Sequence, residues 1–451
     1  MVSMSKTSYK NIWSTAWPVM GALSSYLIFQ AVDMMWIGKL GKEALGGASV
    51  GAAFLLLIFM FSRTISTGSM SLISRAFGAK DEKTLKSVCG DTYVLSVGLG
   101  LLEVAIFLPL LPHIIPLFQL EPEVAHAAHE YMRVILFGAP LWYLTESGFA
   151  FFNGTGRTRT PMIVAFWACL INAVLDPLLL FGWYGFPKLG VAGAAWATVI
   201  ASVFEAALVI YLHARAKGLG RPSFLLKRFY EIISIGLPSS IRDISFPLVD
   251  IIMFRVVAPY GSAAVAALGI AGRVTGLMVI YIVGLSIALA SLAGQQIGAK
   301  LSHSVPQLLF RTIIIGSLFH LVVCIFIFAF PHTWLGLFVA DTEVFDIGTP
   351  MLLILTVTMF PTLFVRSLSS IFQASGKTWV IFQAAILGQW LVHVPLAWYA
   401  SSNRVDIRWI WLSFAVGRLV ETMVLGYAYW KKQWCGTLAG VQKGGNSWVR
   451  N

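Results

Sequence analysis

The stretch 166–182 (FWACLINAVLDPLLLFG) carries two polar residues inside an otherwise apolar run. Asn172 and Asp176 are four residues apart, so on a helix they share one face. Pro177 has no backbone N–H, which leaves a carbonyl one turn earlier without its helical partner. An Asp at the centre of a membrane helix costs about 2.5–3.5 kcal/mol. A carboxylate, an amide oxygen and a loosened backbone could bind a small cation or hold a proton; the alternative is an Asp at a helix end that reaches water.

A second carboxylate, Asp33, lies in the first apolar run together with two aromatic residues and an amide. Tyr26, Phe29 and Gln30 fall on the same helical face as Asp33. Aromatic rings beside a carboxylate suit an amphipathic cation. The alternative is an Asp33 that is solvated near the outer end of its helix. The candidate substrate-binding residues are Tyr26, Phe29, Gln30, Asp33, Thr145 and Phe149.

The composition indicates a membrane protein. Of 451 residues 58% are hydrophobic and 12% are charged, and the mean hydropathy is +0.79. A soluble domain has about 25% charged residues. The net charge of +12 does not require a nucleic-acid partner, because Lys and Arg collect in the cytoplasmic loops of membrane proteins. The four cysteines form no C-x-x-C pair, so neither a disulfide framework nor a zinc site is expected.

Apolar runs long enough to span a bilayer predict about twelve transmembrane helices and an all-α polytopic fold. They lie near 12–38, 48–74, 90–113, 130–152, 161–182, 190–212, 231–258, 264–293, 309–331, 346–374, 379–400 and 409–430. With the N-terminus inside, 20 Lys and Arg fall in inner loops and tails and 5 in outer loops. We therefore expect both termini in the cytoplasm.

The two halves of the chain repeat at a constant offset of 220 residues. Pro18 matches Pro238, Gly41 matches Gly261, and the segment 152–158 (FNGTGRT) matches 372–378 (FQASGKT). Two such halves predict two pseudo-symmetric six-helix bundles with a cavity between them that can open to either side. We expect an N-terminal lobe over 1–219, including a basic cytoplasmic linker, and a C-terminal lobe over 220–451.

Several ordered motifs resemble the multidrug and toxic compound extrusion (MATE) family, over nearly the whole chain. They are Asp33 followed by WIGKLG at 36–41, RAFGAKD at 75–81, NGTGRT at 153–158, N-x-x-x-D-P at 172–177 and GVAGAAWAT at 190–198. The resemblance implies a cation-coupled antiporter that exports small, often amphipathic or cationic compounds. It is closest to the branch whose cation site lies in the N-terminal lobe.

The resemblance also implies a set of cation-coupling residues. In that branch the site uses an Asp, a Tyr, an Asn–Asp pair and a Thr, and the matching positions are Asp33, Tyr131, Asn172, Asp176 and Thr198. Asp33, Asn172, Asp176 and Thr198 would be the ligands if the ion is Na⁺. The alternative for Tyr131 is an aromatic residue at the membrane interface.

Two carboxylates close together in a low dielectric cannot both carry charge cheaply. A proton, a sodium ion or a cationic substrate relieves the repulsion, so ion and substrate would compete for one site and exchange would be obligatory. Pro18 is the candidate hinge, because a Pro inside a helix kinks it.

The C-terminal half has no match for Asn172 and Asp176 but is rich in arginine. One interpretation is a basic wall for an anionic group or a latch between the halves. The preferred one pairs Arg242 with Asp243 or Asp250 and Arg418 with Glu421. The remaining C-terminal arginines in apolar runs are Arg255, Arg273 and Arg366.

The main alternative function is a lipid-linked oligosaccharide or lipid flippase of the same superfamily. A major facilitator is disfavoured, because the loop at 78–83 (GAKDEK) lacks that family's pattern. No nucleophile–base pair, metal cluster or phosphate loop has useful spacing, so we expect neither an enzyme nor ATP drive. We expect no cofactor beyond H⁺ or Na⁺ as coupling ion, a small-molecule substrate, the plasma (inner) membrane, a monomer and no nucleic acid.

Overall fold

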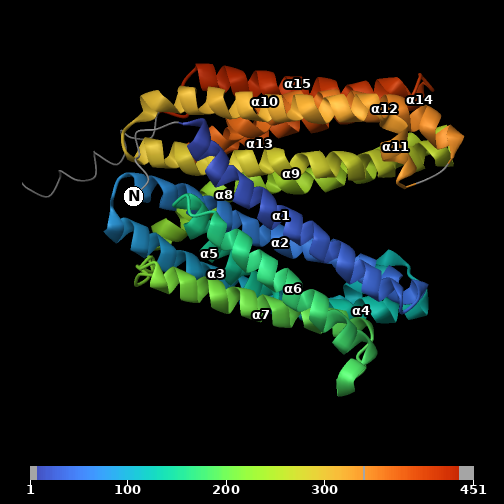
Figure 1. The fold of residues 1–451 in the computed structure, drawn as a ribbon, viewed down its shortest axis with the longest axis horizontal. Helices are drawn as coiled ribbons and strands as arrows, with labels where there is room; N and C mark the ends of the chain where they lie inside the picture. Colours follow the sequence, from blue (N-terminus) through green and yellow to red (C-terminus); the bar gives the residue numbers. More distant parts are fainter. Residues whose placement is uncertain (1–7, 339–340, 436–451) are drawn as a thin grey trace, which may run out of the picture. The chain divides into compact units, whose positions relative to one another are not determined.

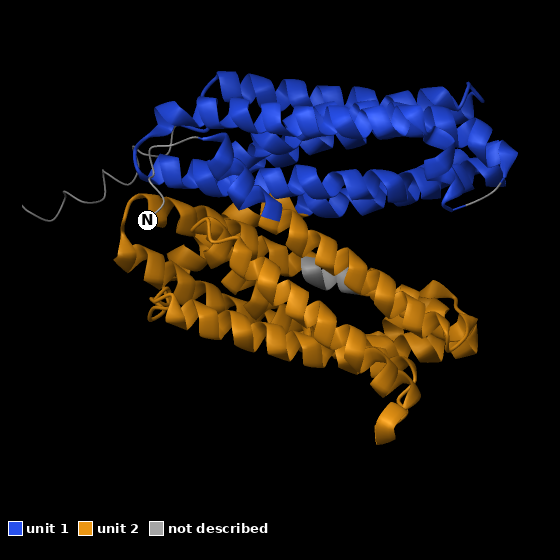
Figure 2. Ribbon diagram, viewed as in Figure 1, with its two compact units in different colours: residues 1–17, 241–451 blue, residues 18–240 orange. Residues whose placement is uncertain are grey.

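The computed structural model describes residues 8–338 and 341–435, with the side chains of all of these except 55–59. Packing divides the chain into two compact units, coloured separately in Figure 2. Unit 1 comprises residues 1–17 and 241–451, and unit 2 comprises residues 18–240. The lobe boundaries expected from the sequence, 1–219 and 220–451, stay a prediction.

Unit 2 is built from long helices that run side by side (Figure 1). It contains most of α1 (Tyr9–Gly38) and the first part of α8 (Leu226–Val257), with α2 (Lys42–Gly78), α3 (Glu82–Ile114), η1 (Ile115–Phe118), α4 (Pro122–Leu136), α5 (Ala139–Gly154), α6 (Arg159–Phe181), η2 (Trp183–Gly185) and α7 (Val191–Arg215) between them.

Unit 1 repeats this construction with the second half of the chain. After the rest of α8 it contains η3 (Ala258–Tyr260), α9 (Ser262–Gly298), η4 (Ser302–Ser304), α10 (Val305–Ala329), α11 (Pro331–Gly336), α12 (Thr342–Ser375), α13 (Trp379–Ala385), η5 (Ile386–His393), α14 (Val394–Ser402) and α15 (Arg408–Trp430).

The backbone preserves the 220-residue offset. α2 and α9 have the same length, 37 residues, and begin and end at matched positions. Each follows a glycine with positive φ, Gly41 at 123° and Gly261 at 100°. Lys80 and Lys300 then turn the chain with φ of 57° and 62°. The repeat read from the sequence is therefore a repeat of local conformation as well.

Two helices cross from one unit into the other. α1 passes from unit 1 to unit 2 between Trp17 and Pro18, and α8 passes the other way between Ser240 and Ile241. In unit 2, the early part of α8 packs directly on the backbone of α2: a Cβ at Gly68 would meet Ile232, and one at Gly236 would meet the backbone of Thr64. Glycine is required at both positions because the two helix backbones touch.

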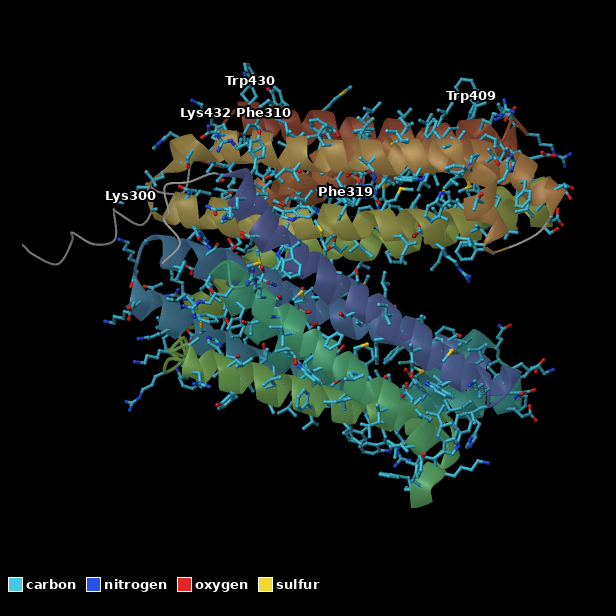
Figure 3. The ribbon with its side chains drawn as sticks, in the orientation of Figure 1. Lys300, Phe310, Phe319, Trp409, Trp430 and Lys432 are labelled. Atoms are coloured by element: carbon cyan, nitrogen blue, oxygen red, sulfur yellow. The ribbon has the colours of Figure 1, made fainter. Side chains whose placement is uncertain are left out.

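Within the described residues, nine helices are long and apolar enough to cross a membrane, or ten if the pair α4 and α5, bent by 49°, counts as one span. Each of the twelve predicted stretches falls on a helix or on a broken helix. Exposed Trp409 and Trp430 stand at opposite ends of α15 in Figure 3, with Lys300 and Lys432 toward the Trp430 end. Their separation, roughly 32 Å of helix, matches the apolar thickness of a bilayer, about 30 Å, and tryptophans are enriched at its two interfaces.

The basic linker after α7 is held in place by a carboxylate of α3. Asp91 is fully buried and accepts hydrogen bonds from the backbone N–H groups of Ser223 and Phe224 at 2.6 and 3.1 Å, and from the Ser223 hydroxyl. Gly90 and Gly220 allow the two backbones to approach, since a Cβ on either would collide with the other segment. This part of the linker thus belongs structurally to unit 2.

Candidate cation site

The packing of α6 against α7 in unit 2 positions Asn172 and Thr198. The chain leaves α6 and returns with two backbone hydrogen bonds, from Leu189 N–H to the Leu179 carbonyl at 2.9 Å and from Gly190 N–H to the Leu180 carbonyl at 3.3 Å. Gly193 then lies directly on the α6 backbone, where a Cβ would meet the Leu179 carbonyl. Because the end of α6 and the start of α7 are this close, Thr198 lies opposite Asn172.

The Asn172 amide joins Asp176 to Thr198. In the orientation that satisfies both of its ends, its nitrogen donates to Asp176 Oδ2 at 3.1 Å and its oxygen accepts from the Thr198 N–H at 3.2 Å. In the other orientation Nδ2 donates to Thr198 Oγ1 at 3.3 Å. The four-residue spacing therefore does bring Asn172 and Asp176 together, and Thr198 completes the group.

Asp176 and Asp33 are both removed from solvent. Asp176 is 0% exposed and Asp33 is 4% exposed, which argues against the alternative that either one is solvated at a helix end. Oδ1 of each carboxylate lacks a hydrogen-bond partner among the described residues. The two side chains lie within electrostatic reach of each other. Two buried carboxylates with unused oxygens form a site that attracts cations.

Tyr131 of α4 lies beside these carboxylates. Its side chain is buried in the apolar core between α2, α4 and α7, and its hydroxyl is within electrostatic reach of Asp33, Asp176 and Tyr26. Gly51 of α2 faces the ring, which a Cβ would strike. This burial argues against the interfacial alternative for Tyr131. The structure thus brings all five predicted cation-coupling residues into one part of unit 2, and their role stays a prediction.

The predicted substrate face of α1 divides into two environments. Asp33 is buried, whereas Tyr26 is 36% exposed and accepts a hydrogen bond from Gln30 Nε2 at 3.1 Å. The Tyr26 and Phe29 ring centroids are 6.0 Å apart. These three residues therefore form an accessible aromatic and amide surface on the helix that carries Asp33.

Thr145 and Phe149 both lie on α5, and the contacts described for them do not include Asp33. Thr145 is buried on α5, and its Oγ1 has no hydrogen-bond partner within the described residues. Phe149 packs on a separate apolar cluster that includes Ile73 and Phe151. Their assignment to the substrate site remains a prediction.

The ion pairs expected for two C-terminal arginines are confirmed. Arg242 pairs with Asp243 at 2.8 Å, and Arg418 pairs with Glu421 at 3.0 Å. His320 is also a satisfied core residue, since Nδ1 meets the Tyr281 hydroxyl at 2.6 Å and Nε2 meets the Thr356 carbonyl at 2.8 Å.

Sequence reasoning left a second polar group in unit 2 without a role. Arg63, Glu146 and Glu205, from α2, α5 and α7, all lie within electrostatic reach of Tyr26. Glu103 of α3 lies beside the Tyr143 hydroxyl. Isolated charges inside apolar runs mark these residues in the sequence as candidates for a polar site. Their mutual proximity depends on helix packing, which the sequence does not reveal.

Known proteins resemble the chain along most of its length. A family model described as MatE matches residues 18–178 and 238–399. The probable multidrug resistance protein YoeA of Bacillus subtilis is 30% identical over 419 residues, covering 90% of this chain and 89% of that protein. The FAD transporter of Shewanella oneidensis is 28% identical over 341 residues, covering 73% of this chain and 74% of that protein.

A solved structure of a MOP superfamily transporter from Pyrococcus furiosus has the same fold. It superposes with a TM-score of 0.86 at 23% identity, covering 94% of this chain and 96% of that one. Together with the membrane-length helices, these matches define a multi-pass membrane transporter, and not an enzyme. The chain belongs to the MATE family.

Proposed function

We propose that this transporter is an antiporter that exports small amphipathic or cationic compounds in exchange for H⁺ or Na⁺. The observation that carries the proposal is the pair of buried carboxylates, Asp33 and Asp176, on different helices and within electrostatic reach of each other. The similarity to the multidrug resistance protein YoeA supports export of foreign compounds.

The exchange follows from competition for negative charge. With both carboxylates ionised and unoccupied, the buried site is destabilised by mutual repulsion and by loss of hydration. A proton on one carboxylate removes the repulsion, and a sodium ion can do the same with oxygen ligands from Asp33, Asp176, Asn172 and Thr198. A cationic substrate on the Tyr26–Asp33 face of α1 replaces the ion, so alternating access with only one of the two bound produces antiport.

Proteoliposomes loaded with a cationic dye test this proposal, with pH and sodium gradients imposed separately. We expect Asp33→Asn and Asp176→Asn to abolish gradient-driven transport, because neither amide can release a proton or contribute a charged ligand. Asp346→Asn, at an exposed position at the start of α12, is the matched control and should transport normally. Uphill transport at the parental rate by both site variants would refute the mechanism, and the gradient that drives the parent identifies the ion.

A second candidate function is export of an anionic compound. The Shewanella relative is an FAD transporter, and unit 1 holds Arg242, Arg366 and Arg418 close together. The same arginines favour the lipid-linked oligosaccharide flippase, whose substrate carries a pyrophosphate. Expression that raises tolerance to cationic dyes supports the antiporter, whereas lipid translocation without dye tolerance would support the flippase.

We place the protein in the plasma (inner) membrane as a monomer, with both termini in the cytoplasm. The positions of Lys300 and Lys432 at one end of unit 1 support this orientation (Figure 3). The outermost residues, 1–7 and 436–451, lie outside the described residues.

A further inference from the structure

Three arginines from three helices of unit 1 lie near one another, two of them over one aromatic ring. Arg366 of α12 and Arg418 of α15 lie over the Phe246 ring of α8, with guanidinium carbons 5.4 and 4.5 Å from its centroid. Arg242, one turn before Phe246, is within electrostatic reach of Arg366. Like charges converge in this way only where something else compensates them.

The carboxylates of this cluster are shared among the arginines. Asp243 Oδ1 accepts from Arg242 Nε and Nη2 at 3.1 and 2.8 Å, and from Arg366 Nη1 at 3.4 Å. Glu421 takes both of its contacts from Arg418 Nη1, at 3.2 and 3.0 Å. Asp250, at an exposed position, is also within electrostatic reach of Arg418. Arg366 is therefore the arginine with the longest ion-pair contact in the cluster.

Donors in the cluster remain unused. Arg242 is 3% exposed and Arg418 is 4% exposed, yet Arg242 Nη1 and Arg418 Nε have no hydrogen-bond acceptor in the described part of the chain. Gln389 of η5, which accepts a hydrogen bond from Ser245, also has an Nε2 without an acceptor among the described residues. A buried N–H group without an acceptor destabilises the protein, and more so when it belongs to a charged group. Unused guanidinium donors of this kind are potential partners for an oxyanion.

The Arg366 edge of the cluster is more exposed than the Arg418 edge. The side chains of Arg366 and Asp243 are 20% and 29% exposed, whereas those of Arg418 and Glu421 are 5% and 1% exposed. The Arg366–Asp243 contact, at 3.4 Å, is the longest ion pair of the cluster. An incoming anion can therefore replace Asp243 at Arg366 without breaking the Arg418–Glu421 pair.

The π-helical segment η5 supports the cluster from the other side. Gly388 presses on the Gly417 carbonyl and on the Glu421 side chain, where no Cβ fits, and this fixes α15 against η5. His393, at the end of η5, is within electrostatic reach of Arg418 and bonds Ser413 at 2.9 Å. Single π turns within membrane-length helices are frequent at functional sites.

We propose that Arg242, Arg366 and Arg418 form an oxyanion subsite for a phosphate or carboxylate group of the transported compound. Guanidinium groups match such anions in charge and in planar hydrogen-bond geometry. Asp243 pairs with Arg366 when no anion is present, and a bound anion displaces Asp243 from Arg366. The use of the subsite in export rests on the proposed transport function, but its occupancy is a separate equilibrium property.

The test compares two ligands that differ by one phosphate, riboflavin and riboflavin 5′-phosphate. Binding to the full-length protein in phosphatidylcholine nanodiscs is measured by flavin fluorescence anisotropy without any ion gradient. We expect the phosphorylated ligand to bind at least tenfold more tightly. Arg366→Gln should remove this preference, and Asp243→Asn should increase it several-fold, because Arg366 loses its competitor.

Controls separate the subsite from misfolding and from lipid binding. Arg273→Gln, at an exposed position of α9 outside the cluster, should leave the preference unchanged. Opposite shifts in the two cluster variants cannot arise from general loss of structure. Equal binding of both flavins, or the same loss in both cluster variants, would overturn the proposal. A preference abolished in phosphatidylglycerol nanodiscs but present in phosphatidylcholine would assign the subsite to lipid headgroups and overturn its role toward transported compounds.

Failure of this test and failure of antiport are distinguishable. Gradient-driven dye export that depends on Asp33 and Asp176 can persist without any phosphate preference, and the preference is measured without transport.

Discussion

At the scale of single residues, two carboxylates behave as their surroundings dictate. Asp176 is buried beside an amide and a second acid. Its negative charge destabilises this site unless a cation or a proton neutralises it. Asp91 is buried as well, but two backbone N–H groups and a hydroxyl satisfy it, so it fastens the linker. Burial alone therefore does not mark a functional acid; unmet hydrogen-bonding capacity does.

Thr198 provides a graded test of the candidate cation site. Thr198→Ala keeps the backbone N–H that bonds Asn172 but removes the hydroxyl that we propose as an oxygen ligand of the ion. Loss of one neutral polar contact is worth about 1 kcal/mol, or about fivefold in affinity. We expect the half-saturating concentration of the coupling ion to rise by about that factor in proteoliposomes. Thr198→Ser keeps the hydroxyl and should resemble the parent. Equal behaviour of the two variants would remove Thr198 from the site.

Asp81, in the turn between α2 and α3, predicts a pH dependence of stability. Its side chain accepts hydrogen bonds from the Thr84 hydroxyl at 2.6 Å and the Thr84 N–H at 3.0 Å, and these hold the pKa of the Asp81 carboxyl below its ordinary value. Because the folded pKa is lowered, the stabilisation is present at neutral pH and is lost as the pH falls through that lowered value.

The corresponding measurement is thermal unfolding in detergent. Asp81→Ala should destabilise the protein by about 1 kcal/mol at pH 7, as expected for loss of an N-cap. The difference from the parent should shrink as the pH falls below 4, and a difference that is independent of pH would contradict the capping role. Lys227→Ala, an exposed change at the start of α8, is the control.

At the scale of elements, helix ends are decided by caps and glycines more than by hydropathy. The apolar run predicted at 90–113 belongs to α3, which starts eight residues earlier, at Glu82, because Asp81 caps it. α9 spans 37 residues, about 55 Å, and so extends well past an apolar slab of about 30 Å. Apolar runs predict the part of a helix that lies in lipid, and the caps determine the rest.

Some elements could be predicted because they repeat, and others could not. Because the sequence repeats at an offset of 220 residues, Gly41 and Gly261 take the same positive-φ conformation in the two halves. The repeat could not predict η5, because the matching stretch of the first half, in α6, is an uninterrupted α-helix; in the second half Gly388 packs closely on α15. The grouping of Arg63, Glu146 and Glu205 near Tyr26 was equally hidden, since it depends on the packing of four helices.

The contact between α8 and α2 can be tested at one glycine. Gly236→Ala places a methyl group into the Thr64 backbone, so the helices must separate, at a cost of about 1–3 kcal/mol for overpacking. We expect a lower melting temperature in detergent. Gly98→Ala on α3 is the matched control, because a Cβ there meets nothing within 4 Å, and it should match or exceed the parent. Equal melting temperatures of the two variants would contradict the close packing.

At the scale of the whole molecule, the change of unit within α1 coincides with a proline. Pro18 is the tenth residue of α1, well past the first turn, so Ser14 loses a helical donor at the point where the chain enters unit 2. Pro238 stands two residues before the matching change in α8. The hinge expected at Pro18 stays a prediction, now with a defined position.

Pro18→Ala should stiffen α1 at this position. We expect slower transport in proteoliposomes, by severalfold, with unchanged equilibrium dye affinity in detergent, because residues 26–33 keep their helical face. Ala16→Gly, two residues earlier, loosens the same helix without restoring a donor and serves as the comparison. A variant with parental transport rate, or with weakened binding, would exclude the hinge.

The crossing of α1 and α8 also bears on how the polypeptide is made. The segment Tyr9–Trp17 packs with residues 241–430. A ribosome synthesises this segment long before it makes those later residues. Likewise, the N-terminal half lacks residues 226–240, which pack on α2, until synthesis has passed the linker. Neither half can therefore mature alone, and severing the gene at the linker should yield two products that accumulate only when expressed together.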